Sequence, residues 1–160
     1  MIAESSPRVY LDANVFIYAL EGTGEIAKPA ISILDLLRRH RGHGVTSEVT
    51  LLEVLARAKR SGGAALHRRY LDLLVLNGYF GLVPVTRSVI YAAVEYRERV
   101  QLKDGSDPLL KRAIDANHAA SALTEGCAAV LTNDLRIRMP EPISVMPHDD
   151  QALRFVQALL

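Results

Sequence analysis

Apolar and polar residues follow one another in blocks along this chain, and each block has the length of a strand or a helix. Short apolar runs predict strands at about 8–11, around Val45, and at 81–86, 128–132 and 143–146. Between them, apolar residues recur at helical spacing, which predicts helices at about 15–20, 25–41, 48–60, 64–77, 87–103 and 114–125 and an amphipathic helix at the C-terminal end. Pro84 places the third strand near an edge of the sheet, because proline cannot donate a ladder hydrogen bond.

Strands that alternate with helices predict parallel strands joined by right-handed crossovers, with helices on both faces. We therefore expect a three-layer α/β/α sandwich with a central, mostly parallel sheet of about four to five strands. At 160 residues, and with no repeat or linker, residues 1–160 form a single domain in this interpretation. In the helix at 48–60, Ser47 is the expected N-cap, and Val49, Leu52, Leu55 and Ala56 are the expected inner face.

Composition excludes several classes of protein. Apolar residues make up 49% of the chain and charged residues 23%, which is ordinary globular usage rather than that of a disordered, fibrous or membrane protein. No apolar run approaches the roughly 20 residues that span a bilayer, and the N-terminal residues do not resemble a signal peptide, so we expect a cytoplasmic protein. The single cysteine, Cys127, fits a reducing compartment and a buried position in the core.

Four acidic residues stand where a predicted strand ends or on a predicted helix: Asp12, Glu53, Asp115 and Asp134. Asp12 and Asp134 each follow an apolar strand, and open parallel sheets bind ligands beyond the carboxyl ends of their strands. If those two strands are neighbours, the two carboxylates face each other. Separately, each acid has a plainer explanation: Asp12 can cap a helix, Asp134 can belong to a polar loop, and Asp115 can be a first-turn acid.

Glu53 differs from the other three because it lies in the middle of a predicted apolar helix, between Leu52 and Val54. A carboxylate there needs either solvent or a strong reason to be inside. Glu48 is the competing acid, but its place in the first helical turn explains it. We therefore prefer Glu53 as a member of the acidic cluster.

Carboxylates crowded into one crevice repel one another unless a cation is present. Mg²⁺ or Mn²⁺ takes oxygen ligands and is commonly held by a few carboxylates together with a substrate phosphate. One such ion, or two, would support phosphodiester hydrolysis. Asn14, two residues after Asp12, is placed to bond that carboxylate or a metal-bound water.

Other polar residues near these acids are candidate substrate contacts. Arg112 and Arg136 lie three residues before Asp115 and two after Asp134, within reach of a phosphate. Asn14 and Asn133 complete this group. His118 lies one helical turn after Asp115 as a possible general acid, but a packed, hydrogen-bonded role explains such a histidine, and we leave it outside the catalytic set.

Four segments together resemble the PIN-domain nucleases, in particular the VapC-like ribonuclease toxins of toxin-antitoxin pairs. The segments are Tyr10-Leu11-Asp12-Ala13-Asn14-Val15, the stretch 46–53 ending in Glu53, Ile114-Asp115-Ala116-Asn117-His118-Ala119-Ala120 and Leu131-Thr132-Asn133-Asp134. The resemblance implies Mg²⁺- or Mn²⁺-dependent RNA cleavage by the four acids, a homodimer and inhibition by a small antitoxin. Ala13 departs from the family, in which Thr or Ser is usual, and so removes a hydroxyl near the metal.

Three other functions remain open beside the toxin interpretation. The chain could be a PIN-like RNA-processing nuclease without an antitoxin. It could also be a PIN-like module that binds RNA or protein without cutting, with Ala13 as a sign of decay. A haloacid-dehalogenase-type phosphatase also begins with a strand and an Asp, but it needs a second Asp where this chain has Asn14, so we rank it below the others.

Overall fold

The structure is a computed structural model that describes residues 7–99, 109–134 and 136–160. For residues 97–99 and 109–112 it describes the backbone without the side chains. The last part of the predicted helix at 87–103 and the segment 104–108 that follows it therefore lie outside the described residues.

The described residues form one five-stranded sheet in which every strand is parallel to its neighbours. Its order is β3-β2-β1-β4-β5, and the strands are β1 (Val9–Leu11), β2 (Gly44–Ser47), β3 (Gly81–Val83), β4 (Ala129–Leu131) and β5 (Ser144–Met146). The strand before Pro84 is thus at an edge, as predicted. β1 and β4 are neighbours, with Leu11 opposite Leu131, so Asp12 and Thr132 leave the sheet side by side.

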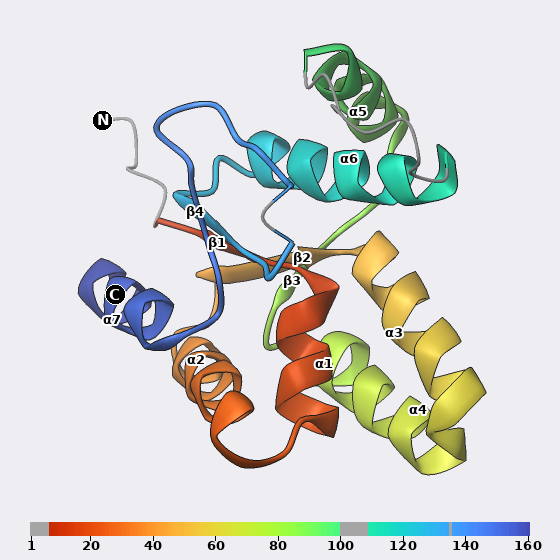
Figure 1. The fold of residues 1–160 in the computed structure, drawn as a ribbon, viewed down its shortest axis with the longest axis vertical. Helices are drawn as coiled ribbons and strands as arrows, with labels where there is room; N and C mark the ends of the chain where they lie inside the picture. Colours follow the sequence, from red (N-terminus) through yellow and green to blue (C-terminus); the bar gives the residue numbers. More distant parts are fainter. Residues whose placement is uncertain (1–6, 100–108, 135) are drawn as a thin grey trace.

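Helices cover both faces of this sheet. They are α1 (Ala13–Glu21), α2 (Lys28–Arg39), α3 (Glu48–Ser61), α4 (Gly63–Leu71), α5 (Arg87–Arg99), α6 (Leu109–Thr124) and α7 (Asp150–Leu159), with a 3-10 turn at Gly24–Ile26 and a π-helical turn at Asp72–Leu76. Figure 1 shows α5 and α6 on one side of the sheet and the other helices on the opposite side. The predicted three-layer α/β/α sandwich is confirmed.

Alternation along the central strands divides the core between these layers. In β1, Val9 and Leu11 pack into the cluster shared with α1, α2 and α7, whereas Tyr10 packs on the other face with Val130 of β4. Cys127 is buried in this second cluster, as expected, and burial raises the pKa of its thiol to about 12. α6 lies between the sheet and α5, and it meets α5 through Ala116 and Ala120.

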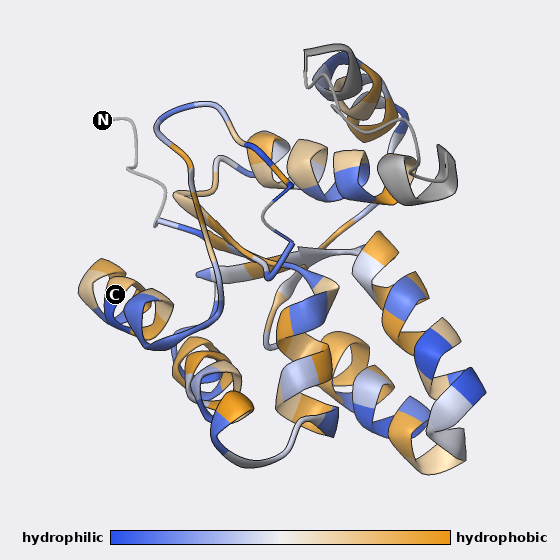
Figure 2. Cartoon of the chain, in the orientation of Figure 1, coloured by the Kyte–Doolittle hydropathy of each residue, from blue (hydrophilic) through white to orange (hydrophobic). Residues whose placement is uncertain are grey.

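The predicted inner face of α3 is wrong in part: Leu55 packs against the core, but Leu52 and Ala56 are exposed. Its buried residues are Thr50, Val54 and Ala58, whereas Leu52 is 62% exposed. Two of the three buried residues are only weakly apolar or polar, and Thr50 is satisfied because the Thr46 hydroxyl donates to its Oγ at 2.8 Å. Figure 2 shows hydrophobic and hydrophilic bands alternating along α3, so hydropathy alone points to no single face. The expected N-cap is confirmed, since the Ser47 hydroxyl accepts from the backbone N–H of Val49.

α6 begins at Leu109, five residues before the predicted start. Asp115 is therefore the seventh residue of the helix rather than a first-turn residue. The helix macrodipole, which acts within the first turn, does not explain an acid at this position. Across the described ranges, no helix has both the length and the apolar character needed to cross a membrane.

Candidate active site

Asp12 stands at the carboxyl end of β1 and is 4% exposed. Its side chain caps α1 by accepting from the Ala13 N–H at 2.7 Å. The other oxygen, Oδ2, accepts from Asn14 Nδ2 at 3.0 Å and from the Thr132 hydroxyl at 2.6 Å. Asp12 is thus both a helix cap and a carboxylate held at the shared end of β1 and β4, and the predicted contact with Asn14 is confirmed.

His118 of α6 joins Asp12 to Glu53. Its Nε2 lies 2.8 Å from Glu53 Oε2 and 3.3 Å from Asp12 Oδ1, and its Nδ1 lies 2.8 Å from the hydroxyl of Tyr10. Because an ionised carboxylate only accepts, Nε2 carries a proton and donates it toward Glu53. In the neutral imidazole, Nδ1 then accepts from the Tyr10 hydroxyl. Burial lowers the pKa of His118, but the Glu53 hydrogen bond and the charges of Asp12, Glu53 and Asp115 outweigh it, so the net pKa is raised.

The structure separates the two candidate glutamates of α3. The Glu53 side chain is 30% exposed and reaches His118, and ligand atoms of Asp12, Glu53 and His118 all lie within 4.8 Å of one another. Glu48 is exposed and accepts from the backbone N–H of Val85 at 3.0 Å. Glu53, and not Glu48, therefore shares the cluster with Asp12.

Asp115 lies one turn before His118 on α6 and feels the charges of the other acids. Burial raises the pKa of its carboxyl to about 6, and the charge of Asp134 adds to the increase, whereas Arg136 lowers it. Asp12 also raises this pKa. Burial and the neighbouring carboxylates thus both oppose the ionisation of this acid.

Asp134 is paired with Arg136 in the loop after β4. Arg136 Nε donates to Asp134 Oδ1 at 2.8 Å and Nη2 donates to Oδ2 at 2.5 Å, while Nη2 lies 4.0 Å from Asp115 Oδ2. The backbone N–H of Asp134 donates to the hydroxyl of Thr132, the same residue that donates to Asp12. Thr132 therefore links the two acids that follow β1 and β4.

The predicted substrate contacts are only partly gathered at this site. Asn14 donates a hydrogen bond to Asp12, and Arg136 donates one to Asp134. Asn133 is exposed beside Asp134. Arg112 belongs to α6, but its side chain lies outside the described residues.

Three residues that hold the acids were not part of the predicted set: His118 and Thr132, which bond acids directly, and Tyr10, which bonds His118. For His118 the signal was its position one turn after Asp115, which puts both on one side of a helix. Thr132 follows β4 as Asp12 follows β1, so the strand pairing identifies it. Tyr10 looked like any core residue in an apolar strand, and nothing in the pattern marked its hydroxyl.

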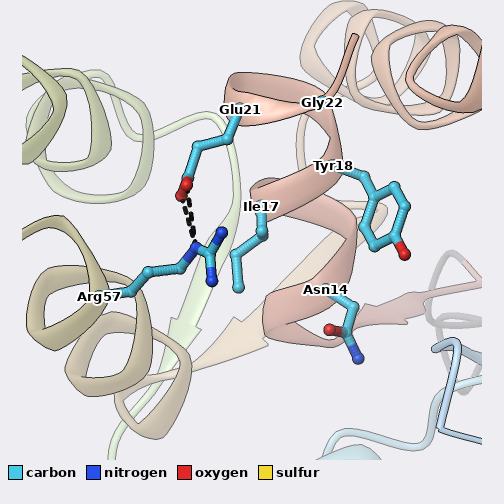
Figure 3. Close-up of a pocket in the computed structure, with 6 residues that line it drawn as sticks. All are labelled: Asn14, Ile17, Tyr18, Glu21, Gly22 and Arg57. Carbon is cyan, nitrogen blue, oxygen red and sulfur yellow. Dashed lines mark hydrogen bonds and ion pairs between the residues drawn. The ribbon is translucent and has the colours of Figure 1, made fainter. Parts of the chain in front are cut away.

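A pocket of about 340 Å³ opens beside Asn14 along α1 and reaches α3. Figure 3 shows Arg57 of α3 and Glu21 paired on one side of α1 and Tyr18 on the other, with Asn14 at the end nearest β1. Arg57 was also absent from the predicted set. Its signal is a position four residues after Glu53, on the same side of α3.

Fold and site together define an open-sheet α/β protein whose acidic residues gather at the carboxyl ends of β1 and β4, where such sheets bind ligands. The family model of the PIN domain matches residues 9–140, and the chain belongs to that family. The resemblance inferred from the four segments is thereby confirmed. No curated protein sequence is significantly similar to this one.

Solved structures of toxin-antitoxin proteins share the fold at low sequence identity. VapBC2 from Rickettsia felis, solved bound to a promoter DNA fragment, is 17% identical with a TM-score of 0.62 and covers 86% of this chain and 97% of its own. The Neisseria gonorrhoeae FitAcB structure is 17% identical with a TM-score of 0.61, covering 88% and 97%. Mycobacterium tuberculosis VapC20, a toxin that cleaves the sarcin-ricin loop, is 16% identical with a TM-score of 0.61, covering 79% and 91%.

Proposed function

We propose that this chain is a Mg²⁺- or Mn²⁺-dependent ribonuclease and the toxin component of a VapBC-type toxin-antitoxin module. The observation that carries the proposal is the cluster of Asp12, Glu53 and His118, whose ligand atoms lie within 4.8 Å of one another, in a chain that belongs to the PIN domain family. Asp115 feels the charges of Asp12 and His118 in this cluster. Similarity in fold to VapC20 and to the VapBC2 and FitAcB structures supports the toxin role.

The residues present fit a hard divalent cation. Asp12, Glu53, Asp115 and Asp134 supply carboxylate oxygens, the ligands that Mg²⁺ and Mn²⁺ prefer. The pKa of Asp115 is raised to about 6 by burial and by Asp134, and a cation would reverse that effect. We propose all four acids as ligands of one or two ions, with Asp134 exchanging its pairing with Arg136 when the cation binds.

A bound divalent ion activates water and stabilises charge on the phosphate during hydrolysis. The protein's own contribution is to hold the acids in place. Thr132 and Asn14 fix Asp12, and His118 fixes Glu53 while its own ring is fixed by the Tyr10 hydroxyl. Such outer partners set the direction of ligand oxygens. Arg136, which pairs with Asp134 and approaches Asp115, would be within reach of a substrate phosphate held beside those acids.

The toxin role brings further expectations. We propose that the protein acts on RNA in the cytoplasm, forms a homodimer and is inhibited by a small antitoxin that covers the acidic site. The solved VapBC2 and FitAcB structures of similar fold support an antitoxin partner.

One observation favours the second candidate, a PIN module that binds without cutting. Arg136 is an internal cation that already pairs with Asp134 and approaches Asp115. If this pairing replaced the metal, the chain would bind no divalent ion. Calorimetric titration with Mn²⁺ decides between the two candidates, because the ribonuclease requires saturable binding, and no binding at millimolar Mn²⁺ would favour the non-cleaving module.

Hydrolysis of a fluorophore-quencher RNA with Mg²⁺ or Mn²⁺ tests the proposed function. We expect Asp12→Asn, Asp115→Asn and Glu53→Gln each to lower the rate by more than about 100-fold, since loss of a ligand should exceed the 10- to 100-fold effect of an outer partner. Glu48→Gln is the matched control on α3, because within the described residues Glu48 accepts a hydrogen bond from the backbone of Val85 and not from a residue of the acidic cluster. Cleavage unchanged in Asp12→Asn and Asp115→Asn would disprove the site.

A further inference from the structure

We propose that the groove along α1, between Arg57 and Tyr18, binds the single-stranded RNA next to the scissile phosphate, with the Arg57 guanidinium contacting a neighbouring phosphate. This inference rests on the proposed ribonuclease function and names a substrate subsite outside the acidic cluster. The groove is lined by Asn14, Ile17, Tyr18, Glu21, Gly22 and Arg57.

Arg57 is held in one orientation by its partners. Its Nε donates to both carboxylate oxygens of Glu21, at 3.0 and 2.9 Å, and the hydroxyl of Tyr70 donates to the same carboxylate at 2.5 Å. The Glu21 side chain is only 17% exposed, whereas that of Arg57 is 44% exposed. A buried tyrosine and a mostly buried glutamate therefore fix a partly exposed guanidinium.

The donors that remain on Arg57 face the groove. Nε bonds Glu21, and neither Nη1 nor Nη2 hydrogen-bonds to any residue in the described part of the chain. Figure 3 shows both amino groups on the side of Ile17 rather than beyond Glu21. A guanidinium fixed through Nε keeps the paired donors that match the oxygens of a phosphate.

The groove continues into the proposed active site. At one end, Asn14 lines the groove and also donates to Asp12. On α3, Arg57 follows Glu53 by four residues, which is one turn and a rise of about 6 Å on the same side of the helix. That rise is of the same order as the distance between successive phosphates of an RNA strand. A strand with one phosphate at the acids would thus bring the next one toward Arg57.

The chemistry of the groove favours RNA over a protein segment. Its walls carry an amide, a guanidinium, the mostly buried carboxylate that pairs with this guanidinium, and a tyrosine ring. The Tyr18 ring packs on His148 at a centroid distance of 4.8 Å. A fixed aromatic ring beside a phosphate contact suits a nucleotide. By contrast, a second groove, between α3 and α4, is lined mainly by apolar Leu51, Leu52, Leu55 and Ala56, which suits a protein chain. The two surfaces therefore call for different partners.

A series of RNA lengths tests the subsite. Dinucleotides, which have a single phosphodiester bond, and oligonucleotides extended on either side are cleaved by wild type and by Arg57→Ala with Mn²⁺. We expect wild type to gain in kcat/KM on extension in one direction, and Arg57→Ala to lose about 10- to 100-fold of that gain through KM, with dinucleotide cleavage unchanged. Arg60→Ala, an exposed arginine of the same helix, is the matched control.

Arg57→Lys and thermal denaturation separate a contact from a structural effect. Lysine keeps the charge but loses the fork, so we expect it to recover only part of the lost gain. If Arg57→Ala lowers the cleavage of dinucleotides and longer RNA equally, or if all of its effect follows a fall in Tm, Arg57 is only a link between α1 and α3, and the proposal is wrong.

Binding without metal keeps this test distinct from that of the proposed function. Anisotropy of a labelled single-stranded RNA is measured in EDTA, where no hydrolysis occurs. If Arg57→Ala binds this RNA more weakly than Arg60→Ala does, the RNA subsite in the groove is supported. This holds even if wild type cleaves no RNA, a result that would contradict only the proposed ribonuclease function. Cleavage by wild type together with equal RNA binding and equal length dependence in both variants overturns the groove and leaves the ribonuclease standing.

Discussion

The site has an inner half and an outer half that differ in how their acids are held. In the inner half, Asp12 accepts from a backbone N–H, an amide and a hydroxyl, and Glu53 accepts from His118. In the outer half, Asp115 has a pKa raised to about 6, and Asp134 is paired with Arg136. The inner acids are positioned by the fold itself. The outer acids are left with an electrostatic conflict that a cation would relieve.

This difference indicates a division of labour between the two halves. A carboxylate with several donors is fixed in position, so it can define where a cation sits. An acid with a raised pKa binds a cation only after losing its proton, so its ionisation is coupled to that binding. The acids of the inner half thus contribute to the stability of the fold as well as to the site, whereas the ionisation of Asp115 in the outer half depends on whether a cation is bound.

The largest effect should come from removing the inner acid. Asp12→Ala deletes the cap of α1 and leaves the Thr132 hydroxyl without its acceptor, so we expect a loss of about 2–4 kcal/mol in the free energy of unfolding. Asp134→Ala should cost less than about 1 kcal/mol, because it breaks a partly exposed ion pair and relieves Asp115. Urea denaturation of the metal-free protein measures both, and equal losses would remove the distinction between the halves.

The next effect concerns His118, which we regard as a positioning residue for Glu53. His118→Leu removes the donor and should weaken Mn²⁺ binding by about 10- to 100-fold, the range for outer partners of a metal site. His118→Gln keeps an N–H near the position of Nε2 and should recover most of that affinity. Calorimetry gives both values. A histidine that only fills space would show no such recovery by glutamine.

The smallest effect is a pH dependence of stability caused by Asp115. Its folded pKa of about 6 exceeds the roughly 3.9 of an unfolded aspartate, so the stability it contributes is fully present below about pH 4 and is lost as pH rises through 6. Asp115→Asn lacks this loss. Relative to wild type it should gain about 1–2 kcal/mol between pH 4 and pH 7.5, a range reduced because the side chain is 25% exposed.

Urea denaturation in EDTA at several pH values measures this gain. Saturating Mn²⁺ should abolish it, because the cation favours the ionised carboxylate. A difference between the two proteins that stays constant from pH 4 to pH 7.5 would show that Asp115 does not titrate in this range.

Much of the fold follows from local patterns in the chain. The apolar runs around Val9 and Val45 are short, and a helical segment follows each, so the alternation of strands and helices and the parallel pairing could be predicted. The start of α6 was predicted five residues too late, although Asp107 before Pro108 is itself a helix-start signal in the sequence. The face of α3 was wrong in part because Thr50 and Ala58 are buried for reasons of close packing and hydrogen bonding.

The site was predictable in part for the same reason. An acid directly after a strand is visible in the chain, and so is an acid inside an apolar helix. The partners that hold those acids are not, because Tyr10 and His118 meet only through the packing of α6 on β1. Arg57 and its groove depend on the packing of α3 against α1, and this packing cannot be predicted from the residue spacing within either helix.

Two alanines of α6 help to position the acidic site although they do not belong to it. Ala116 and Ala120 meet α5, while Asp115 and His118 on the same helix reach the site. A larger side chain at either alanine would push the helix away from α5 and carry both functional residues with it. In an engineered variant, such a position would be less tolerant of change than its lack of chemistry suggests. The accuracy of the site is thus shared by residues that never meet a substrate.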